Sequence, residues 1–121
     1  MNSIKKILIA EDEILVAKVM KMIFERKGFT VMHVLDAADA ERAAKEFSPD
    51  LIVLDIYLRN KSCGIEAGKR IRQNGFKGPI FFTTGNSFIE TSEQIREIGN
   101  TTLFTKPVDP DALMKFIELN F

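Results

Sequence analysis

The sequence has few residues that cross-link a chain or give its surface a strong charge. Cys63 is the only cysteine, so an internal disulfide is excluded. Neither charge is in excess, because Lys plus Arg and Asp plus Glu each count 17. A net charge of zero gives no long-range attraction to nucleic acid or anionic lipid. We therefore expect no direct nucleic-acid binding and no membrane association, and the single thiol suits a cytoplasmic protein.

Long apolar segments, repeats and low-complexity tracts are also missing. Residues 1–6 lead into only four apolar residues, which is too short a run for a signal peptide or a membrane span. What is present is 45% hydrophobic residues over 121 positions, enough for one globular core. We therefore expect one domain over residues 1–121, with no linker and no second domain attached.

Short apolar runs alternate with helical patterns along the whole chain. Five such alternations with short connections predict a parallel sheet covered by helices on both faces. The expected strands are Ile7–Ala10, Thr30–Leu35, Leu51–Asp55, Pro79–Thr84 and Thr102–Lys106.

Capping residues and apolar spacing define the helices between these strands. The first helix is expected to stop at Gly28, and the third to run from about Gly64 to Asn74. Asp36 and Asp109 are the expected N-caps of the second and last helices. The side chains expected to face the core are Val16, Val19, Met20, Ile23 and Phe24, then Ala40, Ala43, Ala44 and Phe47, then Ile65, Gly68 and Ile71, and finally Leu113, Phe116 and Ile117.

Polar residues of particular kinds stand where the expected strands end. Parallel strands bring these ends to one edge of the sheet, where α/β folds open a ligand crevice. Carboxylates gathered there repel one another unless a cation intervenes, and oxygen ligands that leave room for water suit Mg²⁺. A carboxylate can also accept a phosphoryl group, whose charge a metal and a lysine would neutralise. The residues at these ends are Glu11, Asp12, Asp55, Thr84 and Lys106.

Each of these residues also has an ordinary structural explanation when taken alone. Asp12 could be the N-cap of the first helix, and Asp55 could cap the loop after its strand. Thr84 is a common type of strand residue, and Lys106 would ordinarily be a solvated charge. All four explanations would have to hold together on one edge, and that conjunction favours a site. His33 has no His or Cys partner at ligand spacing, so we expect a structural or surface role.

The ordered set Glu11-Asp12, Asp55, Thr84 and Lys106-Pro107, on five alternating strands and helices, resembles the receiver domain of two-component response regulators. The resemblance covers essentially the whole chain. It implies a flavodoxin-like (βα)5 doubly wound sheet of five parallel strands in the order 2-1-3-4-5. It also implies a cis peptide bond between the lysine and the proline.

The same resemblance implies a role for each matching residue. Asp55 would accept a phosphoryl group from a histidine kinase or a histidine phosphotransfer protein. Thr84 and Lys106 would then contact the phosphoryl oxygens. The implied ligands of Mg²⁺ are Glu11, Asp12, Asp55 and the backbone carbonyl of Tyr57.

A receiver domain is a signalling module and not a conventional enzyme. Phosphorylation would shift it between two conformations, which a downstream protein target or other domains of a parent protein would detect. We expect a monomer or weak homodimer that is either a stand-alone regulator or one domain of a longer kinase or regulator. No output domain is expected within a chain that ends soon after its last helix.

Three features depart from the usual receiver pattern. Leu103 stands where receivers usually carry Tyr or Phe, with Phe104 next to it. The loop after Asp55 is one residue longer than in many receivers. Tyr57 and Asn86 occupy variable positions near the path of attacking water, and we expect the bulky Tyr57 to slow hydrolysis of the phosphoryl group.

Other functions are compatible with part of this pattern. A phosphatase or phosphotransferase of the haloacid dehalogenase kind also uses Asp, Mg²⁺ and Lys, but its nucleophile lies in an Asp-x-Asp motif that Asp55-Ile56-Tyr57 lacks. A flavin- or nucleotide-binding domain is disfavoured because no Gly-rich phosphate loop occurs. A receiver-like interaction module that does not need phosphate is disfavoured by the intact Asp55, Thr84 and Lys106.

Overall fold

The computed structural model describes residues 4–58, 63–85 and 89–121. In this part of the chain, five strands alternate with five helices. The strands are β1 (Lys6–Ala10), β2 (Thr30–Val34), β3 (Leu51–Asp55), β4 (Ile80–Thr84) and β5 (Thr101–Thr105). The helices are α1 (Ile14–Arg26), α2 (Ala37–Glu46), α3 (Gly64–Gln73), α4 (Ile89–Ile98) and α5 (Pro110–Asn120).

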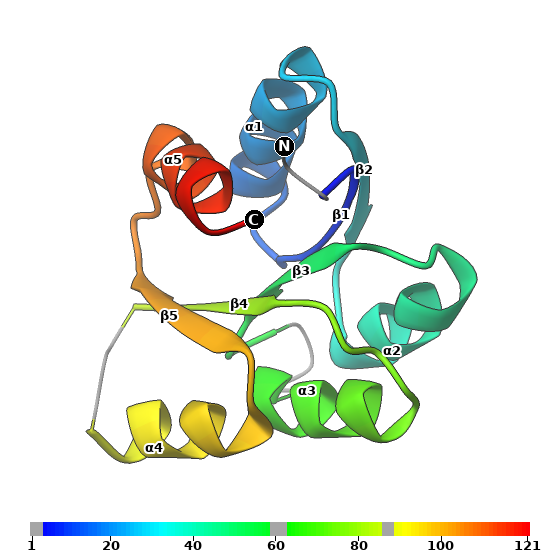
Figure 1. The fold of residues 1–121 in the computed structure, drawn as a ribbon, viewed down its shortest axis with the longest axis vertical. Coiled ribbons are helices and arrows are strands. Elements are labelled where there is room, and N and C mark those ends of the chain that lie inside the picture. The colour runs from blue at the N-terminus through cyan, green and yellow to red at the C-terminus, as the bar shows by residue number, and fades with distance from the viewer. Residues whose placement is uncertain (1–3, 59–62, 86–88) are drawn as a thin grey trace.

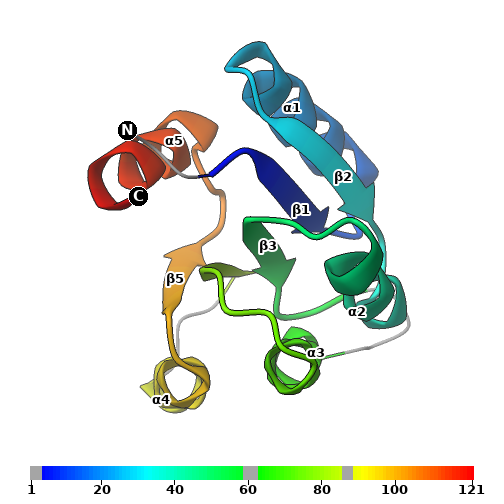
Figure 2. The same cartoon turned by 45° about the vertical axis from the view of Figure 1, so that its right-hand side comes forward.

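The strands form one parallel sheet in the order β2-β1-β3-β4-β5. Helices α1 and α5 cover one face of the sheet, and α2, α3 and α4 cover the other, as Figure 1 and the turned view in Figure 2 show. The expected doubly wound, flavodoxin-like architecture and its strand order are therefore confirmed.

Successive residues of the central strands pack on opposite faces of the sheet. Ile9 of β1 and Val53 of β3 belong to the apolar cluster beneath α1 and α5. Ile52, one position earlier in β3, belongs to the cluster beneath α2, α3 and α4. Side chains alternate between faces along a strand. Asp55 and Glu11 therefore continue the rows of Val53 and Ile9 at the end of the sheet.

The expected helix caps are present at α2 and α5. Asp36 accepts a hydrogen bond from the backbone N–H of Asp39 at 2.8 Å, which caps α2. Asp109 accepts one from the N–H of Asp111 at 2.9 Å, and Pro110 is the first residue of α5. These side chains satisfy backbone donors that the first turn of a helix leaves unpaired.

The expected inner face of α1 was partly wrong. Met20 and Phe24 are buried, but the third buried residue is Ala17. Val16 and Val19, which we expected to face the core, are 43% and 47% exposed. Apolar residues surround much of this helix, so spacing alone does not identify the face that meets the sheet. The small Ala17 allows the helix to lie close to the strands.

Candidate functional site

Three carboxylates meet at the carboxyl end of the sheet. Glu11, Asp12 and Asp55 each offer an oxygen, and these oxygens all lie within 4.8 Å of one another. Glu11 and Asp55 are each only 3% exposed, whereas Asp12 is half-buried. Neighbouring parallel strands β1 and β3 deliver them, so the predicted convergence is confirmed for these three residues.

Asp12 is not the cap of the first helix. The N-cap position of α1 is Glu13, and no side chain makes a capping hydrogen bond there. The ordinary structural explanation that we considered for Asp12 is therefore wrong, and its carboxylate is oriented toward the acidic cluster instead.

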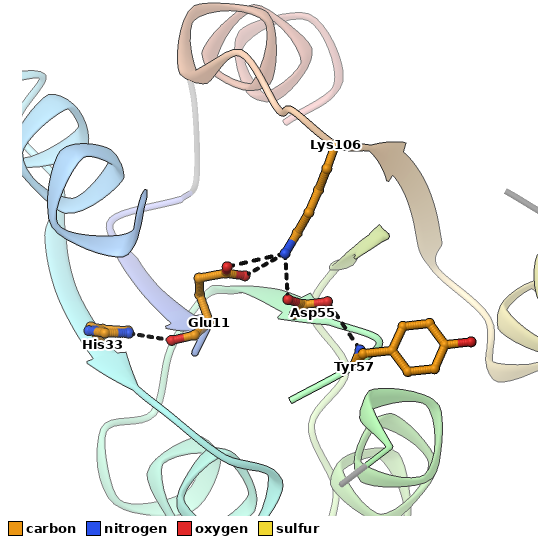
Figure 3. Close-up of polar contacts among 5 residues, drawn as sticks. All are labelled: Glu11, His33, Asp55, Tyr57 and Lys106. Carbon is orange, nitrogen blue, oxygen red and sulfur yellow. Dashed lines mark hydrogen bonds and ion pairs between the residues drawn. The ribbon is translucent and has the colours of Figure 1, made fainter. Parts of the chain in front are cut away.

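Lys106 places its ammonium group between two of the buried carboxylates (Figure 3). Its Nζ lies 2.6 Å from Oδ2 of Asp55 and 3.1 Å from each carboxylate oxygen of Glu11. The Lys106 backbone N–H donates to the Thr84 carbonyl at 2.7 Å, which anchors the lysine to the end of β4. The expected cis peptide bond to Pro107 is present.

Burial and charge shift the pKa values of two groups in this cluster. The pKa of Glu11 is raised to about 7, chiefly by burial and then by the hydrogen bond with Asp55 and the repulsion from its charge, while Lys106 opposes the shift. Burial works against the charge on Lys106, but the hydrogen bonds and attraction of Asp55 and then Glu11 outweigh it and raise the pKa of the ammonium. The lysine is therefore a permanent cation at neutral pH.

Asp55 uses its two oxygens differently. Oδ2 meets Lys106, and Oδ1 accepts a hydrogen bond from the backbone N–H of Tyr57 at 3.1 Å. The carboxylate thus also caps the turn after its strand, as we considered from the sequence. The Tyr57 side chain is 65% exposed, and its ring is directed away from Asp55 (Figure 3).

Thr84 and Gly64 contact the backbone of residues at the site: Thr84 that of Lys106, and Gly64 that of the chain at Asp55 and Ile56. Thr84 ends β4, is 1% exposed, and is connected to Lys106 through the backbone hydrogen bond. Gly64 begins α3, and its N–H donates to the carbonyl of Ile56 at 2.7 Å. A Cβ at position 64 would overlap the Asp55 carbonyl oxygen. The helix therefore approaches the loop after β3 as closely as only glycine permits.

His33 contacts the site in a way that its position in the sequence did not reveal. Its Nε2 lies 2.7 Å from the backbone carbonyl oxygen of Glu11 (Figure 3). We expected a structural or surface role, and the imidazole is indeed half-buried on β2. No ligand spacing could indicate this contact, because the partner is a backbone atom on the neighbouring strand.

Some sequence expectations concern other parts of the chain. Asn86 and residues 59–62 of the loop after Asp55 lie outside the described residues. Among the helices that the structure describes, none is long and apolar enough to cross a membrane.

The sequence model of the response regulator receiver domain matches residues 7–118. The alkaline phosphatase synthesis transcriptional regulatory protein PhoP of Bacillus subtilis is 35% identical over 108 residues, which cover 88% of this chain and 44% of that protein. The aerobic respiration control protein ArcA of Escherichia coli is 30% identical over 107 residues, covering 88% of this chain and 44% of that protein. The chain thus spans about half the length of the curated relatives that it matches.

Solved structures have the same fold. The CheY-like receiver domain protein from Methanospirillum hungatei matches with a TM-score of 0.89 at 25% identity, over 97% of this chain and 93% of that one. A chemotaxis protein from Vibrio cholerae matches with a TM-score of 0.88 at 22% identity, over 98% of this chain and 100% of that one, which supports the fold alone. Together with the family match and the relatives, this places the chain in the family of response regulator receiver domains.

Proposed function

We propose that this receiver domain accepts a phosphoryl group on Asp55 within a two-component phosphorelay and changes conformation to control a partner. The observation that carries the proposal is the charge arrangement around Asp55. Its buried carboxylate lies 2.6 Å from the Lys106 ammonium and within 4.8 Å of oxygens from Glu11 and Asp12. An acceptor carboxylate, a cation and further oxygen ligands are what transfer of a phosphoryl group requires.

The donor set suits Mg²⁺. All three clustered ligands are oxygens, and the half-buried Asp12 leaves the site open to water on one side. Mg²⁺ prefers oxygen ligands and usually keeps several waters. We propose that Glu11, Asp12, Asp55 and the backbone carbonyl of Tyr57 hold the ion. Bound there, it would neutralise charge that develops on the phosphoryl oxygens during transfer.

The chain's own residues supply the rest of the reaction. A carboxylate oxygen of Asp55 attacks phosphorus, the P–N bond of a phosphohistidine breaks, and the imidazole leaves with the bonding electron pair. Lys106 then exchanges its contact with the Asp55 carboxylate for one with the transferred phosphoryl oxygens. Thr84, at the end of the adjacent strand β4, donates a hydrogen bond from its hydroxyl group to the same phosphoryl oxygens. Both contacts draw β4 and β5 toward the acceptor and so couple phosphorylation to conformation.

A protein donor is supported by the surface next to the site. A hollow of about 580 Å³ adjoins Glu11 and Lys106, and Leu15, Val16 and Val19 of α1 line it. Leu15 is 79% exposed, so the helix presents apolar surface beside the acceptor. We propose a histidine kinase or histidine phosphotransfer protein as the donor. A downstream protein target or further domains of a parent protein would receive the output, with the receiver as a monomer or weak homodimer in the cytoplasm.

Phosphorylation by a small donor tests the proposal. The protein is incubated with Mg²⁺ and acetyl phosphate, with and without a chelator, and its intact mass is measured beside that of Asp55→Asn. We expect one phosphoryl adduct that requires the metal and is absent from the variant. An adduct on Asp55→Asn at the same level would contradict the proposal. If neither acetyl phosphate nor a phosphorylated histidine kinase labels the folded protein, the phosphate-independent interaction module is favoured.

A further inference from the structure

Residues of β2 contact both backbone polar groups of Glu11, its N–H and its carbonyl. The N–H of Glu11 donates to the carbonyl of Val34 at 3.1 Å. The carbonyl oxygen of Glu11 lies 2.7 Å from Nε2 of His33 (Figure 3). Both backbone groups of Glu11 are therefore tied to β2, although Glu11 lies beyond the end of β1.

The contact between His33 and the Glu11 carbonyl stands where a backbone hydrogen bond would lie if the β1–β2 ladder continued. The β1–β2 ladder ends with the pair Ala10 and Val34, and the chain then turns toward the N-cap of α2 at Asp36. His33 pairs with Ile9, two residues before Glu11, and its side chain leans along the strand toward the Glu11 carbonyl. The imidazole N–H thus takes the place of the next strand N–H.

This carbonyl belongs to the planar peptide unit that joins Glu11 to Asp12. Fixing its oxygen restricts the rotation of the backbone on either side, and hence the directions of two neighbouring acidic side chains. We propose that His33 is a positioning residue for the acidic cluster, which presets Glu11 and Asp12 to bind a divalent cation. The identity of that cation as Mg²⁺ rests on the proposed function, whereas the contact itself does not.

The proposal makes a chemical demand on the imidazole. The Glu11 carbonyl only accepts hydrogen bonds, so Nε2 must carry a hydrogen. A glutamine at position 33 offers an N–H at similar reach, an asparagine is shorter, and a leucine has no donor. His33→Gln should therefore preserve the positioning, and His33→Leu and His33→Asn should lose it. Met32→Leu is the matched control, because Met32 is the neighbouring residue on β2 and is 38% exposed.

The test has one arm without metal and one with Mg²⁺. In the metal-free protein, ¹⁵N NMR of the imidazole reports which ring nitrogen is protonated, and the Asp12 amide signal reports the orientation of the peptide. In the second arm, Mg²⁺ is titrated into each variant. Tyr57 is the only tyrosine and there is no tryptophan, so its fluorescence follows binding near Asp55. Urea unfolding of every variant separates lost stability from lost affinity.

We expect a protonated Nε2, a displaced Asp12 amide signal in His33→Leu, and about tenfold weaker Mg²⁺ binding in that variant. His33→Gln and Met32→Leu should bind Mg²⁺ nearly as the parent chain does. An unprotonated Nε2, or equal Mg²⁺ affinity in the Gln and Leu variants, would overturn the inference. If His33→Leu does not fold, His33→Gln against His33→Asn decides in the same way. A parent chain that takes up no Mg²⁺ would refute the proposed metal site, while the metal-free arm would still decide the role of His33.

Discussion

At the scale of single residues, one cation serves two buried carboxylates. Lys106 contacts both Glu11 and Asp55, and its side chain is only 25% exposed. Two carboxylates this close repel each other, and burial removes the water that would otherwise stabilise their charges. Lys106 is the only cation that contacts them among the described residues, so the least costly adjustment is for one carboxyl group to keep its proton. Glu11 is that group, because its raised pKa means that it keeps its proton to a higher pH than an ordinary glutamate.

The raised pKa of Glu11 predicts how the metal-free fold responds to pH. Between the ordinary value of 4.5 and about 7, the folded protein retains a proton on Glu11 that the unfolded chain releases. Folding therefore takes up a proton in this interval, and the free energy of unfolding contributed by Glu11 falls as pH rises through it. Well above a pH of about 7, Glu11 is ionised in both states and the loss is complete.

Urea unfolding in the presence of a chelator, at several pH values across this interval, measures the effect. The control is Glu11→Gln, which cannot ionise and should show a flatter dependence of stability on pH. Identical slopes for the two proteins, or a stability difference that grows in favour of the parent chain as pH rises, would contradict the assigned role of Glu11.

Tyr57 gives a second prediction at this scale. Its backbone N–H contacts Asp55, while its exposed ring points away from the site. The exposed side chain has room to rotate, so that its ring could cover a phosphoryl group on Asp55 and obstruct the approach of water. We expect Tyr57→Asn to speed dephosphorylation severalfold. Tyr57→Phe, which keeps the size of the ring, should retain the slow rate, and equal rates in all three proteins would refute the shielding role.

At the scale of elements, the close approach of α3 to β3 sets the backbone around Asp55. Gly64 donates to Ile56 and leaves no room for a Cβ against the Asp55 carbonyl. The start of this helix thus fixes the path of the chain just after Asp55. Crowding a packed contact of this kind typically costs about 1–3 kcal/mol, because the neighbouring backbone must shift.

We therefore expect Gly64→Ala to lower the free energy of unfolding by about 1–3 kcal/mol. The same change at Gly85, where a Cβ would meet no atom within 4 Å, is the matched control and should have little effect. Chemical denaturation of the two variants measures the difference. Equal stabilities would show that the contact between α3 and the Asp55 backbone yields without strain.

Strand β5 resolves a question that the sequence left open. Leu103 packs on the side of α2, α3 and α4, whereas Phe104 packs on the opposite side against Phe81 and Phe116, with ring centroids 5.2 and 5.6 Å away. Adjacent strand residues face opposite ways. Phe104 therefore does not take the place of the aromatic residue that receivers usually carry at position 103.

At the scale of the whole molecule, the topology creates the site. Glu11 and Lys106 are far apart in sequence and come from β1 and the end of β5, yet both reach the residue that ends β3. Parallel strands make this meeting predictable, because all of their carboxyl ends lie along one edge. Local sequence patterns also predicted the alternation of strands and helices and the caps at Asp36 and Asp109. The convergence of the acidic residues then followed from the parallel arrangement of the strands.

Other features depended on packing that no local signal encodes. We misassigned the inward face of α1 because the exposed Val19 and the buried Met20 both fit the apolar helical spacing. The spacing alone does not distinguish them. The strand order came from the family resemblance, since the alternation of elements permits several orders. The contact of His33 with Glu11 depends on the register between β1 and β2, and neither residue predicts it alone.

The central claim is that Asp55 is the residue that carries the phosphoryl group, and mapping the acyl phosphate tests it most directly. An aspartyl phosphate is a mixed anhydride that borohydride reduces to an alcohol, which converts the modified aspartate into homoserine. The phosphorylated protein is reduced, digested and sequenced by mass spectrometry. We predict homoserine at position 55 and at no other aspartate, including the neighbouring Asp12. Homoserine at another position, with Asp55 unchanged in a protein that carries the adduct, would contradict the account.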